Sequence, residues 1–286
     1  MPTVALVLGS GGARGNAHIG VIQVLEEQGF DIISISGCSM GAVVGGMYAA
    51  GKLPLFTEWV TGLSRFDVFR LVDMSLLSMG AIRGEKAYTI LEEFVGDQLI
   101  EDLPMPYTAV ATDLVKQKEV WFQSGKLMDA IRASVAVPGL IMPVTQDDRF
   151  LVDGGLLNPV PIMPTVADQA DLIIAVNLNI NVDESHAITR KQLVRSQFED
   201  TPELPHHKST KSERSHLQWN KMEMLIQCFE TMQATMTKYK MAGFEPDVEV
   251  RINRDVCSFF ELYRAKEMIE IGRTAALEAL QSSRKI

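Results

Sequence analysis

The sequence predicts a three-layer α/β/α fold in which helices cover both faces of a mostly parallel central sheet. Short apolar runs alternate with segments of helical periodicity along most of the chain. The apolar runs, such as residues 4–8 and 172–177, are nearly continuous, as expected for strands that are buried on both faces. The chain has 286 residues, of which 47% are hydrophobic, so it is long enough to bury a large core.

Each element follows from its local pattern. Residues 4–8 lead into a glycine-rich turn and then into apolar residues at helical spacing over 17–28, a helix that Gly29 ends. The same strand-then-helix pattern recurs at 32–36 and 41–50. Further strands are expected at 107–112, 119–123, 149–152, 172–177 and 246–252. Further helices are expected at 54–63, 85–95, 126–132, 217–239 and 259–280.

A polar segment interrupts this pattern at about 180–216, and a methionine-rich amphipathic helix is predicted at about 217–240. Residues 186–221 carry seven Lys or Arg against four Asp or Glu, in a chain whose net charge is −9. We interpret residues 1–286 as a single domain with a polar insertion or lid. The insertion and the helix form either a membrane-docking patch or a solvated loop followed by a packing or dimer-interface helix. Met and Phe at helical spacing favour packing.

The net charge and the cysteine content limit which classes of partner and which cellular compartment are expected. A net charge of −9 argues against nucleic acid as the main partner, because neutralising phosphates requires clustered Lys and Arg. Cys38, Cys228 and Cys257 are odd in number and far apart, which fits a reducing cytosol and predicts no disulfide framework. No signal peptide and no run of about 18 apolar residues is found. We expect a cytoplasmic protein; peripheral contact with the inner face of the membrane and an oligomeric state stay open.

Ser39 lies between two glycines at the junction of a predicted strand and a predicted helix. The segment GCSMG, residues 37–41, fits G-x-S-x-G, a tight turn that lifts the serine hydroxyl to the carboxyl end of the sheet and requires small neighbours at Gly37 and Gly41. The N-terminus of the following helix favours negative charge nearby. An ordinary tight turn is the alternative, because the pattern alone is common in glycine-rich α/β proteins. We interpret Cys38 as a small packed residue.

The segment GSGGARG, residues 9–15, also joins a strand to a helix. A dinucleotide-binding G-x-G-x-x-G pattern would need glycine where Arg14 stands, and the Gly-Lys-Ser/Thr of a P-loop is absent. What remains is a loop of small residues whose backbone N–H groups can converge near a helix N-terminus. Such a loop suits an anion, including the oxyanion of an acyl-transfer intermediate. A close turn with no ligand is the alternative.

A reactive serine needs a general base, and an aspartate is a better candidate than any of the five histidines. His18 follows the glycine-rich loop. The other four lie in or beside the polar segment, where exposed histidines are expected: His186, His206, His207 and His216. Asp153 ends a short predicted strand and precedes two glycines, at a strand end where α/β sheets place their sites. Its carboxylate can serve as a base if desolvation raises its pKa and the hydroxyl is within reach. A turn in which Asp153 only accepts capping hydrogen bonds is the alternative.

The order of these motifs resembles the patatin-like phospholipase family. A glycine loop with an arginine is followed within about 30 residues by G-x-S-x-G and, over 100 residues later, by D-G-G. The stretches ATDLVKQKEVWFQSGKLMDAIRASVAVPGLIMPV and LVDGGLLNPVPI look like the catalytic core of that family. The C-terminal AKEMIEIGRTAALEAL is similar to the end of its stand-alone bacterial members. The resemblance covers most of residues 4–178 and 246–282.

The resemblance implies a Ser–Asp dyad, with Ser39 as the nucleophile and Asp153 as the base, and neither a metal nor a cofactor. It assigns the oxyanion hole to the backbone N–H groups of Gly11, Gly12, Ala13 and Arg14. It assigns support of the two motif turns to Gly37, Gly41, Gly154 and Gly155. The chain departs from the family at Ser10, where glycine is frequent; because Ser10 precedes the donors, we expect little effect.

The predicted function is hydrolysis of the carboxylic ester bonds of lipids, most simply a phospholipid or lysophospholipid acyl ester. Two rivals stay open: a non-catalytic or regulatory protein that binds a lipid or a protein partner, and a histidine-dependent esterase. Trp59, Phe66 and Phe69 either line an acyl pocket or pack in the core, and core packing is the favoured interpretation. The head group, the acyl-chain length, the physiological substrate and the role of the Arg14 side chain are not predicted.

Overall fold

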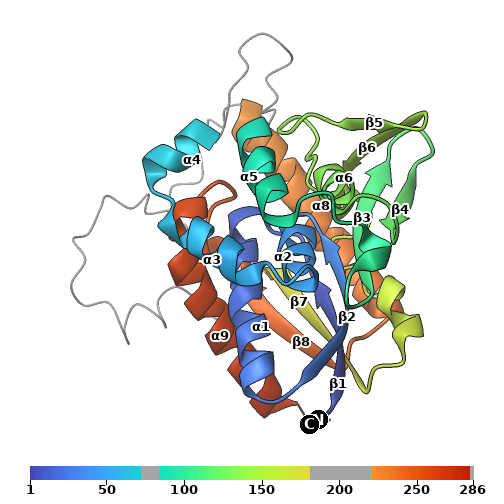
Figure 1. The fold of residues 1–286 in the computed structure, drawn as a ribbon, viewed down its shortest axis with the longest axis vertical. Coiled ribbons are helices and arrows are strands. Elements are labelled where there is room, and N and C mark those ends of the chain that lie inside the picture. The colour runs from blue at the N-terminus through green and yellow to red at the C-terminus, as the bar shows by residue number, and fades with distance from the viewer. Residues whose placement is uncertain (72–83, 181–220, 284–286) are drawn as a thin grey trace, which may run out of the picture.

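The computed structural model describes residues 1–71, 84–180 and 221–283 (Figure 1). An eight-stranded sheet has the order β5-β6-β3-β2-β1-β7-β8, with β4 also paired to β3. The strands are β1 (Thr3–Leu8), β2 (Asp31–Cys38), β3 (Tyr107–Asp113), β4 (Lys118–Phe122), β5 (Val144–Gln146), β6 (Arg149–Asp153), β7 (Leu172–Ile180) and β8 (Val248–Asn253). The helices are α1 (Ala17–Glu27), α2 (Met40–Ala49), α3 (Leu53–Gly62), α4 (Arg65–Leu71), α5 (Glu85–Val95), α6 (Leu127–Ser134), α8 (Lys221–Gly243) and α9 (Ala265–Ser282). Short 3₁₀ turns include η1 (Gly12–Asn16), η3 (Gly154–Leu156) and η4 (Met163–Asp168).

The predicted fold class is confirmed. Strands β3, β2, β1, β7 and β8 are parallel, whereas β4 and β6 are antiparallel to β3, and β5 is antiparallel to β6. Most predicted elements are present with ends shifted by a few residues, but the last helix begins at Ala265 rather than at 259. α4 and β5 were not predicted, because seven and three residues are too few to show a period. Apart from residue 180, the predicted insertion at about 180–216 lies outside the described residues.

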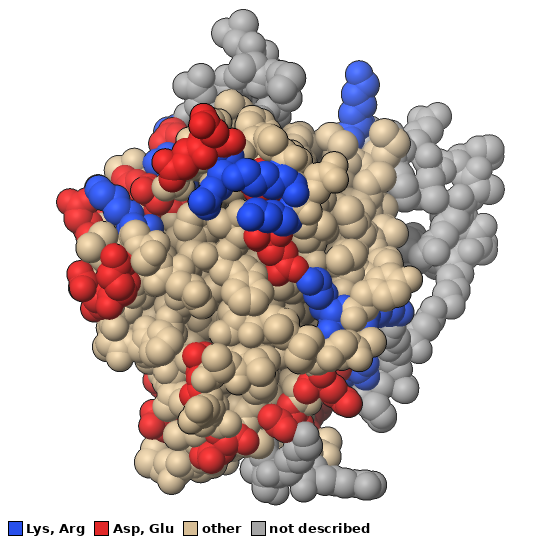
Figure 2. All heavy atoms as spheres, turned by 90° about the vertical axis from the view of Figure 1, so that its right-hand side faces the viewer, with Lys and Arg blue, Asp and Glu red and all other residues tan. Residues whose placement is uncertain are grey.

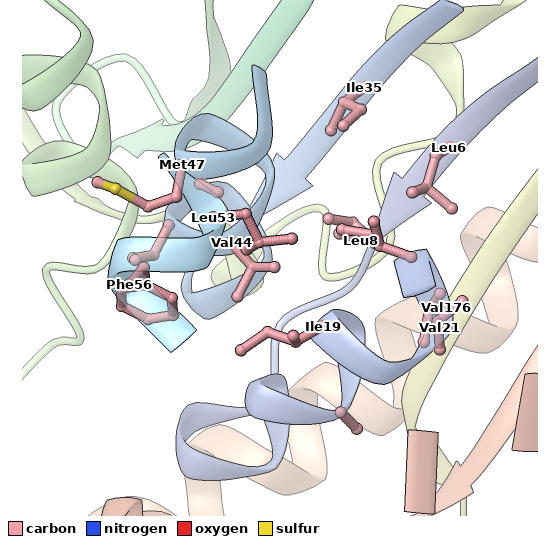
Figure 3. Packing of buried hydrophobic residues seen from close by; sticks show 14 of the residues in the cluster. Leu6, Leu8, Ile19, Val21, Ile35, Val44, Met47, Leu53, Phe56 and Val176 are labelled. Atoms are coloured by element: carbon pink, nitrogen blue, oxygen red, sulfur yellow. The ribbon is translucent and has the colours of Figure 1, made fainter. Parts of the chain in front are cut away.

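Side chains of the central strands alternate between two apolar layers. Leu6 and Leu8 of β1 belong to the main core with α1, α2 and α9, whereas Val7 belongs to a smaller cluster on the opposite face. Figure 3 shows Leu8, Ile19 of α1 and Val44 of α2 directed into the space between the sheet and these helices. The segment around η4 and the C-terminal end of α8 cover the opposite face. The sheet is therefore buried on both sides, as the continuous apolar runs predict.

Helices α1 and α9 pack closely through two glycines. A Cβ atom added at Gly272 of α9 would lie 1.9 Å from the carbonyl oxygen of Ala17. A Cβ atom added at Gly20 of α1 would lie 2.0 Å from the carbonyl oxygen of Ile269. Neither helix can accept a side chain at these positions without moving, and α1 begins directly after the glycine-rich loop.

Gly272→Ala is expected to lower the free energy of unfolding by about 2–3 kcal/mol, because the added methyl group overlaps backbone atoms. Chemical denaturation of the purified variant measures this loss. Gly62→Ala is the matched control, since Gly62 also lies in a helix but has no neighbour within 4 Å of an added Cβ. It should be neutral or stabilising by up to about 1 kcal/mol. Equal effects of the two substitutions would contradict the close packing of α1 and α9.

The aromatic residues of α3 and α4 differ in burial. Trp59 packs between the rings of Phe56 and Phe94, at centroid distances of 5.8 and 6.3 Å, so its interpretation as a packing residue is confirmed. The same interpretation is wrong for Phe66 and Phe69, which are 60% and 72% exposed. The short helix α4 has a single buried residue, Val68, and turns both phenylalanines away from the core.

Charged side chains are distributed unevenly on the face shown in Figure 2. Basic and acidic side chains lie next to one another in its upper half, further acidic side chains lie along its left and lower margins, and a broad central area is uncharged. Within residues 1–71, 84–180 and 221–283, no helix combines the length and the apolar character that crossing a membrane requires.

Candidate active site

The carboxyl ends of β2 and β6 meet on one edge of β3. All five residues of strand β4 pair with the opposite edge of β3, at Ala109 to Asp113. On the shared edge, β2 ends with Cys38 opposite Val110, and β6 ends with Asp153 opposite Ala111. Because β2 is parallel and β6 antiparallel to β3, the two strands run head-on toward each other. Two residues more than 100 positions apart, Ser39 and Asp153, are thereby brought to one junction.

Ser39 has a strained backbone at the start of α2. Its φ of 56° and ψ of −124° lie outside the regions that residues with a side chain normally occupy. A Cβ atom at Gly37 would lie 2.4 Å from the carbonyl oxygen of Gly41, and one at Gly41 would lie 2.1 Å from that of Leu8. Both glycines of G-x-S-x-G are therefore required by space, as the pattern predicts.

Ser134, the last residue of α6, supports this turn. Its Oγ accepts a hydrogen bond from the N–H of Ser39 at 2.9 Å and donates one to the carbonyl oxygen of Val110 at 2.7 Å. The residue is fully buried. Ser134 was not predicted from the sequence, because a serine at the end of a helix carries no signal of a contact 95 residues away.

Asp153 is fully buried at the end of β6. Its Oδ1 accepts hydrogen bonds from the N–H of Gly155 at 2.7 Å and from the thiol of Cys38 at 3.8 Å, whereas Oδ2 has no hydrogen-bond partner within the described residues. Burial raises the pKa of Asp153 to about 7, opposed by interactions with the Ser39 hydroxyl, the Gly155 N–H and Cys38. The Ser39 hydroxyl is among the groups that favour the ionised form of Asp153.

The thiol of Cys38 contacts the carboxyl of Asp153, so this residue does more than fill space. Burial and the nearby Asp153 carboxylate raise the pKa of Cys38 well above its usual value. The thiol therefore stays protonated and donates to Oδ1. The junction is crowded on both sides: a Cβ atom at Gly154 would lie 2.2 Å from the carbonyl oxygen of Val110 and 3.1 Å from the sulfur of Cys38.

The glycine-rich loop, residues 9–15, lies beside Ser39 because β1 is the neighbour of β2. A Cβ atom at Gly15 would lie 2.2 Å from Cγ of Met40, the residue after Ser39. The loop thus approaches the turn too closely for a side chain at that position.

The four N–H groups assigned to the oxyanion hole differ in their availability. The N–H of Ala13 donates to the carbonyl oxygen of Phe259 at 2.9 Å, and the N–H of Arg14 donates to that of Gly11 at 3.2 Å. The N–H groups of Gly11 and Gly12 have no acceptor in the part of the chain that the structure describes. In this conformation two of the four assigned donors are therefore free to bind an anion.

The family model of patatin-like phospholipases matches residues 6–166, which is more than half of the chain. The chain belongs to the patatin-like phospholipase family. An uncharacterised NTE-family protein of Mycobacterium tuberculosis is 38% identical over 331 aligned positions, which cover 98% of this chain and 92% of that protein. A lysophospholipase of Neurospora crassa is 33% identical over 185 positions, covering 62% of this chain and 12% of its own length.

The fold is also similar to the crystal structure of VipD from Legionella pneumophila. The TM-score is 0.59 at 14% sequence identity, and the match covers 99% of this chain and 67% of VipD. Because the sequence identity is this low, the similarity to VipD shows only that the two proteins share a fold.

His18 of this patatin-like protein contacts the glycine-rich loop. Its Nε2 donates a hydrogen bond to the carbonyl oxygen of Gly9 at 2.8 Å, and its ring is fully buried. Burial lowers the pKa of His18 to about 4, so the ring is neutral at physiological pH. The other four histidines, at 186, 206, 207 and 216, lie outside the described residues.

Helix α8 also reaches the site of this family member, which sequence analysis did not predict. Glu230 pairs with Arg14 at 2.9 Å, and Nε2 of Gln233 donates to Oγ of Ser10 at 2.7 Å. Both side chains come from the methionine-rich helix, whose sequence pattern revealed its apolar face but not these two polar contacts. The buried Arg14 side chain thus has a partly buried acidic partner.

Proposed function

We propose that this protein hydrolyses carboxylic ester bonds of lipids, with Ser39 as the nucleophile and Asp153 as the general base. One juxtaposition carries the proposal: a serine on a strained turn lies beside a buried carboxyl whose pKa is raised to about 7. A carboxyl with a pKa near neutrality accepts a hydroxyl proton more readily than an ordinary aspartate does.

In the first step, Oγ of Ser39 attacks the ester carbonyl carbon while the Asp153 carboxylate accepts the hydroxyl proton. The carbonyl electron pair moves to the oxygen and forms an oxyanion. When this intermediate collapses, the bond to the leaving alcohol breaks, and the alcohol takes the proton from Asp153. An acyl group is left on Ser39.

In the second step, water attacks the acyl-enzyme and gives its proton to Asp153. Collapse of the new intermediate releases the fatty acid and returns the proton to Ser39. Of the four assigned donors, the N–H groups of Gly11 and Gly12 are free to stabilise both oxyanions. For Ala13 and Arg14 to join them, their N–H groups would first have to leave the carbonyl oxygens of Phe259 and Gly11.

A phospholipid or lysophospholipid acyl ester is the proposed substrate class. Membership in the patatin-like phospholipase family and the similarity to a lysophospholipase support it. We also propose a cytoplasmic enzyme that contacts the inner face of a membrane peripherally, since its substrate would reside there.

Fatty-acid release from a panel of phospholipids, lysophospholipids and short-chain esters tests the proposal, with Ser39→Ala as the control. Hydrolysis that the wild-type protein performs and Ser39→Ala does not is the expected result. If no ester is hydrolysed and the protein still binds lipid vesicles, the non-catalytic alternative is correct. Equal hydrolysis by the wild type and by Ser39→Ala would refute the assignment of the nucleophile.

The rate should fall in acid, because only the ionised form of Asp153 can act as a base. With a pKa of about 7, kcat/KM for a short-chain ester is expected to rise between about pH 5 and pH 7 and to level off above about pH 8. A profile measured from pH 5 to pH 9 checks this. A rate that is already level at pH 5 would show an ordinary, solvated carboxylate. Loss of the inflection on substituting one of the four histidines at 186, 206, 207 and 216 would favour the histidine-dependent esterase.

A further inference from the structure

Helix α8 contacts the glycine-rich loop at two points that flank the free N–H groups. Nε2 of Gln233 donates a hydrogen bond to Oγ of Ser10 at 2.7 Å. Nη2 of Arg14 lies 2.9 Å from Oε1 of Glu230. Ser10 precedes the two free N–H groups in the sequence and Arg14 follows them. Glu230 and Gln233 are three residues apart, so both project from the same face of α8.

Three of the four partners are buried, and Glu230 is 14% exposed. The exposed fraction is 0% for Ser10, 2% for Arg14 and 1% for Gln233. Removing Glu230 would leave a buried guanidinium without its counter-charge, which is strongly unfavourable. A second anchor, from Nη1 of Arg14 to the carbonyl oxygen of Arg254 at 2.9 Å, fixes the same side chain from the C-terminal part of the chain.

Gln233 also lies against the turn that follows the catalytic aspartate. A Cβ atom at Gly155 would lie 2.1 Å from Nε2 of Gln233 and 3.0 Å from both Oδ1 of Asp153 and Oγ of Ser10. The absence of a side chain at Gly155 thus leaves the space that the Gln233 amide occupies. The amide sits where the glycine-rich loop and the D-G-G turn come together.

We propose that Gln233 and Glu230 are positioning residues that hold the glycine-rich loop in the conformation that leaves the N–H groups of Gly11 and Gly12 free. The inference rests on the proposed ester hydrolysis. Because an oxyanion forms only on the way to and from the transition state, displacing its donors raises the barrier without weakening substrate binding. The family resemblance predicted that serine in place of glycine at position 10 would have little effect. In this proposal the Ser10 hydroxyl has a role, because it accepts the hydrogen bond from Gln233.

The kinetic test uses a soluble short-chain nitrophenyl ester and three proteins: Gln233→Met, Ser10→Ala and the double variant. Each single substitution is expected to lower kcat by about 10- to 100-fold with KM within about twofold of the wild type. The double variant should be no worse than either single one, because both remove the same hydrogen bond. Gln227→Met is the matched control: within the described residues its amide bonds only to Thr231 of the same helix, so kcat should not change.

Glu230 gives a second, independent arm. Glu230→Gln keeps an oxygen that can accept from Arg14, whereas Glu230→Ala removes it, so the loss of kcat should be smaller for Gln than for Ala. Thermal unfolding identifies any variant that does not fold. Ser10→Ala and Gln233→Met each remove one partner of the same hydrogen bond, so the test still works if one of the two variants does not fold.

Unchanged or increased kcat in folded Gln233→Met and Ser10→Ala would overturn the proposal, and an increase would show that α8 obstructs the site. Multiplicative losses in the double variant would also overturn it. If the wild-type protein hydrolyses the ester and the variants match it, only the positioning role fails. If the wild-type protein neither hydrolyses the ester nor reacts at Ser39, the proposed function fails as well.

Discussion

Replacing Ser39 by alanine is expected to lower ester hydrolysis by about 10³-fold or more, because it removes the proposed nucleophile, while the buried Cys38 thiol and Ser134 hydroxyl at the same junction are held in hydrogen bonds. The fold should survive the change. The backbone of the turn is held by its glycine contacts and by the bond from the Ser39 N–H to Ser134, neither of which uses the lost hydroxyl. Fatty-acid release and thermal unfolding, measured on the same preparation, separate loss of chemistry from loss of structure.

Ser36→Ala is the matched control for this substitution. Ser36 is also buried in β2, three residues upstream, and its Oγ has no hydrogen-bond partner within the described residues. Its removal should leave the rate near the wild-type value. Comparable losses of hydrolysis rate in the two variants would mean that Ser39→Ala acts by disturbing strand β2 and not by removing a nucleophile.

Asp153→Asn should abolish hydrolysis and, at pH 8, make the protein more stable. Folding raises the pKa of Asp153 to about 7, so the folded state binds a proton that the unfolded state releases near pH 4. Stability is therefore lost as the pH rises from about 4 to 7, by an amount on the order of 2–4 kcal/mol, and stays lower above that range. Asparagine is neutral at every pH, and its Oδ1 can still accept the N–H of Gly155.

The variant should therefore unfold at a higher denaturant concentration than the wild type at pH 8, and the difference should shrink toward pH 4. Asp113→Asn is the matched control: Asp113 is another fully buried aspartate, at the end of β3, whose Oδ1 accepts from the N–H groups of Val115 and Lys116. It should retain activity. Residual hydrolysis in Asp153→Asn at the wild-type rate, or a loss of stability at pH 8, would contradict the role and the environment assigned to the carboxyl.

These two substitutions describe one physical arrangement. A carboxyl that is shielded from water is costly to ionise, and the same cost makes it a base at neutral pH. The strained backbone of Ser39 adds a second local cost at the same junction. The large two-sided core described above supplies the stability that holds both residues in place.

Much of the fold was predictable because its information is local. Continuous apolar runs identify the parallel strands β1, β2 and β7, which are buried on both faces, and glycines mark the turns that follow β1 and β2. The two motif turns were predictable for the same reason, since glycine is required wherever backbones approach as closely as Gly37 does to Gly41. The family resemblance then joined motifs that no local pattern connects.

The contacts between distant segments were not predictable. The antiparallel direction of β6, which turns Asp153 toward the end of β2, depends on pairing with β3. Ser134, Glu230 and Gln233 reach the site across 95, 216 and 223 residues of sequence, and each looks like an ordinary helical residue in its own segment. The exposure of Phe66 was not predicted, because the apolar character of a residue does not show whether its short helix packs against another element on that side.

Reaction with a fluorophosphonate probe tests the central claim most directly, because the probe labels a serine only when nucleophile, base and oxyanion donors act together. Mass spectrometry locates the adduct, and the labelling rate is measured from pH 5 to pH 9 in the wild type and in Asp153→Asn. We expect a single adduct on Ser39, a rate that rises through about pH 7, and almost no labelling of Asp153→Asn. An adduct on another residue, or labelling of Asp153→Asn at the wild-type rate, would contradict a Ser39–Asp153 dyad.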